Sequence, residues 1–418
     1  MTQCAFTIVA KNYIGLGQIL GKSLREHNPE VDFKIFVADE FDTLPANLPA
    51  EVVMAKEVIK DITPDQWQDM SFKYDLTEFC TSIKPFCFHY IFSLGYDKAY
   101  YFDPDIYVFS PIDQIASALD THSVCLTPQI AGIHTHYTGE HPEWAMNVNG
   151  IFNLGFCGIR NDEWGQLVVK WWQERLRDNA FTDRSVGNFT DQKWMDWMPG
   201  FLGSKLCVLQ SLGMNMAPWN YFERRLSADA DGGITVSFRT DDCPQRHDRL
   251  VFIHFAGYDY SKLKQGIVAR KRIEDLEEYA DLSTVNEIYR DAIQQNASVF
   301  DSFINQPYSY ARYDNGKSIA AFHRRLYHGL SAEQQVGNPY STAPGSFYAM
   351  IYKRGMIIEE RIDNVSRRNI GDLNGKKRLL AYFYQALYRV MGYKRYVMFL
   401  KSLYFYCRPE WHTFLIKK

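Results

Sequence analysis

The sequence predicts an α/β protein whose mostly parallel sheet is flanked by helices, followed by a helical C-terminal region. Three observations predict this fold class. Short apolar runs alternate with helical patterns through residues 1–262, acidic residues stand at the ends of several of those runs, and strand patterns fade after residue 262. A chain of 418 residues is long enough for two or three domains.

Strand and helix patterns follow one another in the first half of the chain. We expect strands at residues 5–10, 33–38, 52–55, a run leading into Asp103, 123–126, 152–159 and 251–255. We expect helices at residues 16–27, 76–91 with an interruption at Pro85, 112–119 and 163–179. Such alternation gives parallel strands, and ligands bind beyond their carboxyl ends, where Asp39 and Asp103 fall.

The second half reads as helical. Helical patterns cover residues 273–279 and 285–303, and the Gly- and Pro-containing segment 331–346 is typical of a linker. We therefore expect three parts. They are an α/β domain over residues 1–262, a helical extension and linker over 263–345, and a basic, aromatic helical region over 346–418.

Composition places the chain among globular proteins, because 46% of its residues are hydrophobic and 15% aromatic. The eight cysteines form no C-x-x-C pair, which argues against a zinc module and favours reduced thiols in a cytosol. The N-terminus lacks a charged segment followed by an apolar one, and no apolar run reaches 18 residues. We therefore expect neither a signal peptide nor a spanning helix.

Charge is concentrated at the C-terminal end. Residues 376–418 hold ten basic residues and one acid, a net +9, so the preceding 375 residues carry -3 - 9 = -12. Tyr, Phe and Trp residues interleave with these cations. Cations and aromatics together favour the surface of an anionic membrane, at about 1 kcal/mol per Lys or Arg. The alternatives are packing of the aromatics on the core and, less favoured, nucleic acid; we expect no nucleic acid.

Two acids one residue apart are the strongest chemical signal. Asp103-Pro104-Asp105 interrupts an aromatic, β-branched run, and Pro104 predicts that the strand breaks there. Carboxylates held together at a sheet edge are costly unless paired, and oxygen ligands suit Mg²⁺ or Mn²⁺ bridging a diphosphate. The alternative is a strand-end turn with two solvated aspartates.

Further polar residues interrupt apolar surroundings. His254 ends an apolar strand, with Gly257 three residues on, and is either a third metal ligand or a core histidine. Asn153 and Gly155 stand in another apolar strand, where a glycine allows close approach of a ligand. Asp191-Gln192 opens a predicted helix over residues 191–198, with Thr190 as its cap.

Two other patterns are less informative. The glycines at 15, 17 and 21 superficially suggest a dinucleotide fingerprint, but their spacing is wrong, and we expect them to pack a helix closely on the sheet. His134, His136 and His141 are of a residue type that binds zinc, but no fourth ligand stands at a suitable spacing. We therefore expect a flexible loop that covers an acceptor site.

In this order, the motifs resemble those of nucleotide-sugar glycosyltransferases of the GT-A fold (Rossmann-like), specifically family-8-like enzymes of the bacterial polysaccharide-assembly type. The resemblance covers roughly residues 5–260 and rests on the following matches: the loop Ala10-Lys11-Asn12, Lys84 before the D-x-D strand, Asp103 and Asp105, the F-N-x-G stretch with Asn153 and Gly155, the pair Asp191-Gln192, and H-x-G with His254 and Gly257. There are departures. Lys193 replaces the third acid after D-Q, and Tyr258–Lys262 replaces a Lys, Pro, Trp pattern.

The resemblance implies a metal-dependent glycosyltransferase that moves a hexose from a UDP-sugar to a glycan acceptor. Together with the basic, aromatic segment 376–418, it leads us to expect a lipid-linked acceptor and a peripheral location at the cytoplasmic face of the cell membrane. It implies Mn²⁺ (or Mg²⁺) on Asp103, Asp105 and His254, and catalytic roles for Asn153, Asp191, which orients the sugar, and Gln192, which lies near the anomeric carbon. We expect the donor to be bound by Ala10, Lys11, Asn12, Asp39, Lys84, Gly155, Gly257 and Lys262.

Stereochemistry and reaction class stay open at this point. Retention needs no strong base on the far face and is favoured, whereas inversion needs a carboxylate, for which Asp259 or Glu223 would serve. The competing classes are a sugar-1-phosphate nucleotidyltransferase, which lacks support from a glycine-rich basic phosphate loop, and a non-catalytic glycan-binding module.

Overall fold

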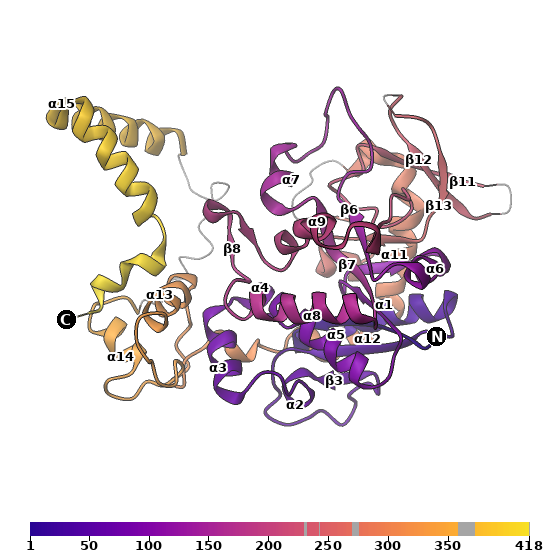
Figure 1. Cartoon of the computed structure of the whole chain (residues 1–418), viewed down its shortest axis with the longest axis horizontal. Helices are drawn as coiled ribbons and strands as arrows, with labels where there is room; N and C mark the ends of the chain where they lie inside the picture. The colour runs from indigo at the N-terminus through magenta and orange to yellow at the C-terminus, as the bar shows by residue number, and fades with distance from the viewer. Residues whose placement is uncertain (230–231, 242, 270–275, 358–372, 418) are drawn as a thin grey trace. The chain divides into compact units, whose positions relative to one another are not determined.

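The computed structural model describes residues 1–229, 232–241, 243–269, 276–357 and 373–417 (Figure 1). The chain divides into two compact units. The first comprises Met1–Thr63 and Leu76–Ser309, and the second Pro64–Asp75 and Tyr310–Lys418. We expected domain boundaries after residues 262 and 345, whereas the two units divide at residues 63/64, 75/76 and 309/310. The three-part division stays a prediction.

A seven-stranded sheet forms the centre of the first unit, in the order β10-β6-β7-β4-β1-β2-β3. Its strands are β1 (Gln3–Val9), β2 (Asp32–Val37), β3 (Val52–Met54), β4 (Lys98–Phe102), β6 (Val124–Pro128), β7 (Phe152–Arg160) and β10 (Leu206–Val208). All neighbouring pairs are parallel except those of β7, which runs antiparallel to β4 and β6. The predicted α/β class with a mostly parallel sheet is confirmed.

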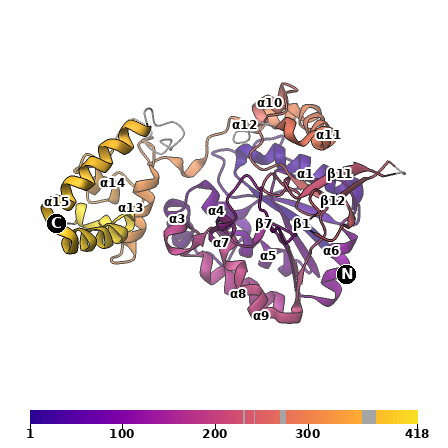
Figure 2. The same ribbon diagram turned by 90° about the horizontal axis from the view of Figure 1, so that it is seen from above.

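Helices cover both faces of this sheet. They include α1 (Ile14–His27), α2 (Ala55–Val58), α4 (Leu76–Ser82), α5 (Lys84–Ser93), α6 (Asp113–Thr121), α7 (Trp144–Asn149), α8 (Glu163–Leu176), α9 (Met198–Leu202), α10 (Tyr260–Lys264), α11 (Ser283–Gln295) and α12 (Ala297–Ile304). In Figure 2, α10, α11 and α12 lie above the sheet, with α5 and α8 below it. The predicted interruption near Pro85 is confirmed, because α4 ends before Ile83 and Pro85 stands in the first turn of α5.

The glycines of α1 serve packing, as predicted. A Cβ on Gly17 would lie 3.1 Å from the Ile35 side chain, and one on Gly21 would lie 2.5 Å from the Phe33 ring. Both partners belong to β2, so the glycines allow the helix to approach the sheet closely. The predicted helix over residues 285–303 is instead two helices, α11 and α12, which part at Asn296. Of the predicted helix at 273–279, residues 273–275 lie outside the described residues, and a 3₁₀ segment spans Leu276–Leu282.

Three small sheets complete the first unit. β5 (Ile106–Val108) pairs antiparallel with β14 (Phe252–His254), β11 (Arg224–Ala228) and β12 (Ile234–Phe238) form a sheet with β13 (His247–Arg249), and β8 (Thr182–Asp183) pairs with β9 (Asn188–Phe189). The β5–β14 pair is the one that positions the candidate site, as described below.

The second unit is helical, which confirms the predicted C-terminal helical region. It holds α3 (Pro64–Lys73), α13 (Ala321–Ser331), α14 (Phe347–Tyr352), α15 (Leu373–Tyr406) and a 3₁₀ segment, η7 (Pro409–Leu415). Its core includes Phe72, Leu326 and Ile416, and the segment 331–346 joins α13 to α14 inside it. α15 is bent at Gly392, whose φ is 69°. Within the described ranges, we find no helix with the length and apolar character required to cross a bilayer.

Candidate metal and donor site

Asp103 and Asp105 occupy the short link between β4 and β5, at the carboxyl edge of the sheet. The backbone N–H of Asp103 donates to the carbonyl of Gly155 over 2.7 Å, and the N–H of Phe255 donates to the carbonyl of Asp105 over 2.8 Å. The register of β14 against β5 places His254 opposite Ile106. The two acids and the histidine, far apart in sequence, are therefore brought together by one antiparallel pair.

The three side chains form a close cluster. His254 Nε2 lies 3.0 Å from Asp105 Oδ1 and 3.6 Å from Asp103 Oδ2. The three ligand atoms lie within 4.8 Å of one another. Two carboxylates and one imidazole are a suitable donor set for Mn²⁺ or Mg²⁺, because hard oxygen ligands dominate and a neutral imidazole suits Mn²⁺. The residues present thus fit the divalent ion predicted from the D-x-D sequence.

Burial and mutual charge set the electrostatics of this cluster. Burial raises the pKa of Asp103, against the opposing charges of His254 and Lys84. Burial alone would raise the pKa of Asp105, but the charge and the hydrogen bond of His254 hold this pKa below its usual value. Burial opposes a charge on His254, but Asp105 and Asp103 outweigh it and raise the pKa of the imidazole. Protein groups therefore only partly balance the negative charge, which favours a cation here.

Gly155 makes room for His254. A Cβ at this position would lie 2.6 Å from two atoms of the His254 ring and 2.8 Å from Asn153 Oδ1. The sequence predicted that a bound ligand comes close to Gly155. In the structure, the group that lies close to Gly155 is the side chain of His254, the candidate metal ligand. The ring of Trp219 packs edge-on against His254, with 5.2 Å between ring centroids.

Lys84 and Asp191 form a buried ion pair. Lys84 Nζ lies 2.5 Å from Asp191 Oδ2, donates to the carbonyl of Leu154 over 2.8 Å, and sits 3.8 Å above the Tyr101 ring centroid. Tyr101 in turn donates its hydroxyl proton to Asp103 Oδ1. Lys84, which was expected to bind the diphosphate, and Asp191, which was expected to orient the sugar, are therefore ion-pair partners. Tyr101 lies between this pair and the metal cluster.

Gln192 connects with the Asn153 region of β7. Its Oε1 accepts from the Leu154 N–H over 3.1 Å and from Asn153 Nδ2 over 3.3 Å, and its Nε2 donates to the Asn149 carbonyl. The segment that follows Asp191 is a 3₁₀ helix, Gln192–Trp197, continued by α9. The predicted Thr190 cap is wrong, because the Thr190 hydroxyl donates to Asp191 Oδ1 and Asp191 itself holds the cap position.

Asn215 is a residue of this network that sequence reasoning missed. It is 1% exposed, has a φ of 54°, and donates from Nδ2 to Asn153 Oδ1 over 3.1 Å and to Thr127 Oγ1 over 2.8 Å. The carbonyl of the next residue, Met216, accepts from the His254 N–H over 2.8 Å. A signal existed in the two asparagines of the otherwise apolar segment Asn215-Met216-Ala217-Pro218-Trp219-Asn220, but nothing in it indicated Asn153 as the partner.

The predicted nucleotide loop lies at the same edge, after β1. Ala10 precedes a 3₁₀ turn, Lys11–Tyr13. Asp39, 1% exposed, accepts from the backbone N–H groups of Lys11 and Ser309, and burial raises its pKa despite these bonds. Lys11 Nζ donates to the Glu40 carbonyl and to Ser309 Oγ. Asn12 Oδ1 is buried and has no hydrogen-bond partner among the described residues.

Other candidates are engaged elsewhere or lie at the surface. Lys262 is exposed on α10, whose N-terminus is capped by Asp259. Gly257 adopts a φ of 77° in the turn after β14. Glu223 is fully buried and accepts from the N–H groups of Ala131 and Gly132 and from His134 Nε2. Asp259 and Glu223 therefore have structural partners, and His134 anchors its loop rather than a metal.

Comparison with known proteins gives the following similarities. No family model matches the chain. It is 24% identical over 306 residues to the uncharacterized protein YfnF of Bacillus subtilis (strain 168), covering 70% of this chain and 92% of YfnF. Its structure is similar to that of the galactosyltransferase LgtC in complex with donor and acceptor sugar analogs, with 14% identity, a TM-score of 0.40, and coverage of 73% of this chain and 98% of LgtC.

A second solved structure with similarity is that of the glycosyltransferase GlyE from Streptococcus pneumoniae TIGR4. Identity is 12%, the TM-score is 0.36, and the match covers 75% of this chain and 67% of GlyE.

Proposed function

We propose that this protein is a metal-dependent glycosyltransferase of the GT-A, family-8-like kind, acting on a nucleotide-sugar. The observation that carries the proposal is the cluster of Asp103, Asp105 and His254 at the carboxyl edge of the sheet. Parallel sheets bind ligands at that edge, and two carboxylates with an imidazole suit a divalent ion that bridges a diphosphate. When bound, the ion neutralises the charge that develops on the departing diphosphate.

A UDP-sugar is the proposed donor. Nucleotide recognition needs groups for the base and ribose beside the metal, and we assign these roles to the turn after β1, which follows a strand of the same sheet. The unpartnered Asn12 Oδ1 is a suitable acceptor for the N3–H of uracil, because a buried carbonyl without a partner is costly. Asp39, which the backbone amides of Lys11 and Ser309 hold in place, is the proposed partner of the ribose hydroxyls.

The buried network behind the metal cluster is proposed to position the sugar. Gln192 is held by Asn153, Leu154 and Asn149, so its amide is fixed at the edge of β7. Asp191 is held in place by Lys84 and is the proposed acceptor for sugar hydroxyls. Retention is the favoured outcome, since Asp259 and Glu223, the acids considered as a base for inversion, are held as a helix cap and a loop anchor.

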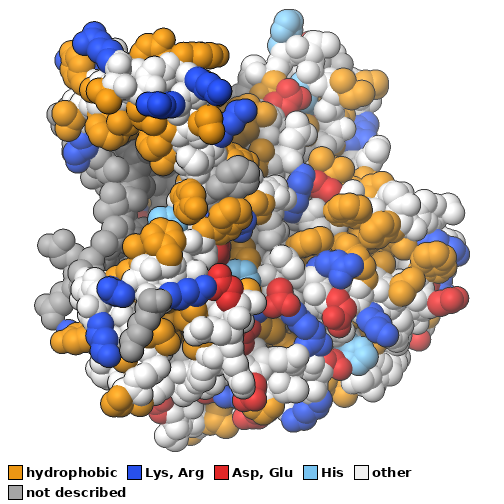
Figure 3. All heavy atoms as spheres, turned by 60° about the vertical axis from the view of Figure 1, so that its left-hand side comes forward, with side chains coloured by type: hydrophobic (Ala, Val, Ile, Leu, Met, Phe, Trp, Pro, Cys, Tyr) orange, Lys and Arg blue, Asp and Glu red, His pale blue; other side chains and the backbone are white. Residues whose placement is uncertain are grey.

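The acceptor is proposed to be a glycan on a lipid, with the protein peripheral on the cytoplasmic face of an anionic membrane. Basic and hydrophobic side chains lie interspersed on the surface at the upper left of Figure 3, where Figure 1 places α15. Exposed on this helix are Leu379, Tyr382, Phe383, Tyr393 and Tyr404, together with Lys376, Lys394 and Arg395. Exposed aromatics beside cations suit a lipid headgroup region better than bulk water.

A screen of nucleotide-sugars in the presence of Mn²⁺ tests the proposal. We expect release of UDP from at least one UDP-hexose, at a rate that rises with a glycan acceptor. Release of pyrophosphate from a nucleoside triphosphate and a sugar-1-phosphate would instead identify the nucleotidyltransferase. Binding of glycans without turnover of any donor would identify the binding module.

A further inference from the structure

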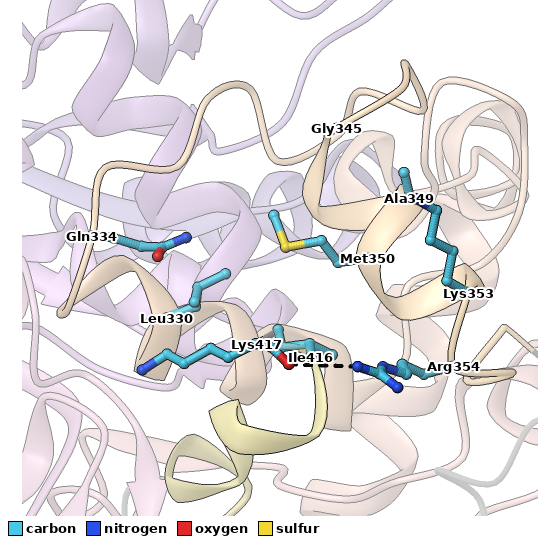
Figure 4. Close-up of a pocket in the computed structure, with 9 residues that line it drawn as sticks. All are labelled: Leu330, Gln334, Gly345, Ala349, Met350, Lys353, Arg354, Ile416 and Lys417. Carbon is cyan, nitrogen blue, oxygen red and sulfur yellow. Dashed lines mark hydrogen bonds between the residues drawn. The ribbon is translucent and has the colours of Figure 1, made fainter.

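A cavity of about 680 Å³ lies in the second unit, between the end of α13, α14 and the C-terminal end of the chain (Figure 4). Its lining has an apolar part and a basic part. Leu330, Met350 and Ile416 give an apolar floor, with Leu330 1% and Ile416 6% exposed. Around this floor stand the cationic side chains Lys353, Arg354 and Lys417. A cavity with an apolar floor and a basic rim suits a ligand that is itself apolar at one end and anionic at the other.

The wall made by the C-terminal segment is firmly built. Gly329 on α13 has no room for a side chain, because a Cβ there would lie 2.0 Å from the Glu410 carbonyl oxygen. Glu410 is buried and lies 3.6 Å from Arg325 and 3.9 Å from Arg408. The segment that carries Ile416 and Lys417 is thus docked closely on α13, and the cavity is part of the folded unit.

In the described part of the chain, some of the positive charge on the rim stands without a carboxylate partner. Lys417 forms an ion pair with Glu333, and Arg354 Nη2 donates to the Lys417 carbonyl over 3.4 Å. Among the described residues, neither Lys353 nor Arg354 has a carboxylate within salt-bridge distance. Charged groups gathered beside an apolar surface are stabilised by an anion, and guanidinium and ammonium groups together bind phosphate well.

We propose that this cavity binds the phosphate headgroup of a membrane lipid, with the first part of its hydrocarbon chain on the apolar floor. The place of the cavity favours this occupant over a free anion. η7, which leads to Ile416 and Lys417, directly follows the exposed, basic and aromatic α15, so a membrane-bound α15 brings lipid phosphates to the rim. A wholly polar anion leaves the floor of Leu330, Met350 and Ile416 unused. The proposal rests on the membrane location proposed above and not on glycosyl transfer.

The test is calorimetric titration of the full-length protein with dihexanoyl phosphatidic acid below its micelle concentration, and separately with inorganic phosphate. We expect the lipid phosphate to bind at least about tenfold more tightly than inorganic phosphate, because the apolar floor adds affinity. The double variant Lys353→Ala/Arg354→Ala should weaken lipid binding by about tenfold or more, since it removes charge-assisted hydrogen bonds. Met350→Glu should weaken lipid binding too, because it places a charged group in the apolar floor of the cavity.

The matched control is Lys376→Ala/Arg378→Ala, which removes the same charge from exposed positions of α15. It should leave binding of the soluble lipid unchanged, and both double variants should keep the wild-type melting temperature. Met350→Glu should melt at a lower temperature but still cooperatively, because Met350 packs against the core of the second unit. Equal affinity for both probes would assign the cavity to free phosphate and overturn the lipid proposal. It is also overturned if neither probe binds, or if the control weakens binding as much as the cavity variants do. None of these outcomes bears on UDP release, which tests the proposed function separately.

Discussion

The ammonium of Lys84 lies 2.5 Å from the carboxylate of Asp191, and both residues are almost completely buried, at 1% and 2% exposure. This pair connects α5 to the turn that carries Gln192. It also connects to the metal cluster, because Lys84 lies over the ring of Tyr101, whose hydroxyl binds Asp103. From the sequence, Lys84 was expected to bind a diphosphate. In the structure, its ammonium group holds Asp191, the candidate catalytic acid, in place.

Replacing Lys84 by Met should be strongly destabilising. The change leaves Asp191 buried without its counter-charge, which typically costs about 3–5 kcal/mol. Urea unfolding of Lys84→Met should show this loss, and the double variant Lys84→Met/Asp191→Leu should recover part of it. The matched control is Lys56→Met, which breaks the exposed pair with Glu40 and should cost less than about 1 kcal/mol. Equal, small effects of the two single variants would show that the buried pair has no special role.

His254 is expected to act as a metal ligand rather than only as a core residue. His254→Ala should weaken Mn²⁺ binding by about tenfold or more, as even the loss of residues behind a ligand often does. The measurement is calorimetric titration with Mn²⁺, with thermal melting in parallel. His247→Ala, at an exposed position of β13, is the control and should bind like the wild type. A lower melting temperature with unchanged Mn²⁺ affinity would return His254 to a purely structural role.

Much of this arrangement is visible in the sequence, because it depends on local patterns. Pro104 indicates where β4 ends, and the alternation of apolar runs and helices predicts the sheet edge at which Asp39 and Asp103 both lie. The antiparallel direction of β7 was not predicted, since periodicity fixes a strand but not its orientation. The pairing of Lys84 with Asp191 and the contact of Asn215 with Asn153 depend on tertiary packing between distant segments, which one sequence does not encode in any short pattern.

Asn215 should be a positioning residue for the site. Asn215→Gly keeps the backbone at φ 54° without strain but removes the amide that binds Asn153. We expect kcat for UDP-sugar turnover to fall about tenfold or more with KM little changed, because small misplacements near the reacting atoms are costly. The melting temperature should fall as well, because Thr127 and Asn153 lose a buried hydrogen-bond partner. Asn215→Ala should add about 1 kcal/mol of instability from backbone strain. Asn315→Gly, at an exposed turn, is the control, and a fall in stability alone would contradict a positioning role.

Charge reversal on α15 should release the protein from anionic membranes. We choose Arg389→Glu/Lys394→Glu/Arg395→Glu, because deleting the C-terminal region would also remove Ile416 from the core of the second unit. Co-sedimentation with anionic vesicles should be lost in the variant, and wild-type binding should weaken with salt, since charges are screened over about 8 Å at physiological ionic strength.

The control for this experiment is Lys22→Glu/Lys60→Glu/Lys170→Glu, an equal change of charge at exposed positions of the first unit. It should reduce vesicle binding far less. Equal losses in both triple variants would mean that net charge, rather than α15, attracts the membrane.

The most direct test of the central claim is a calorimetric titration of UDP into the protein, with Mn²⁺ and with EDTA, for the wild type and Asp105→Asn. Asp105 contacts His254 and is partly exposed, so the variant should fold, and the exposed Asp42→Asn serves as its control. We predict that UDP binds the wild type and Asp42→Asn only with Mn²⁺, and that Asp105→Asn weakens this binding by at least about 100-fold, as expected when a metal ligand is lost. Equal binding of UDP in EDTA, or unchanged metal-dependent binding by Asp105→Asn, would contradict a metal-bridged nucleotide site at Asp103, Asp105 and His254.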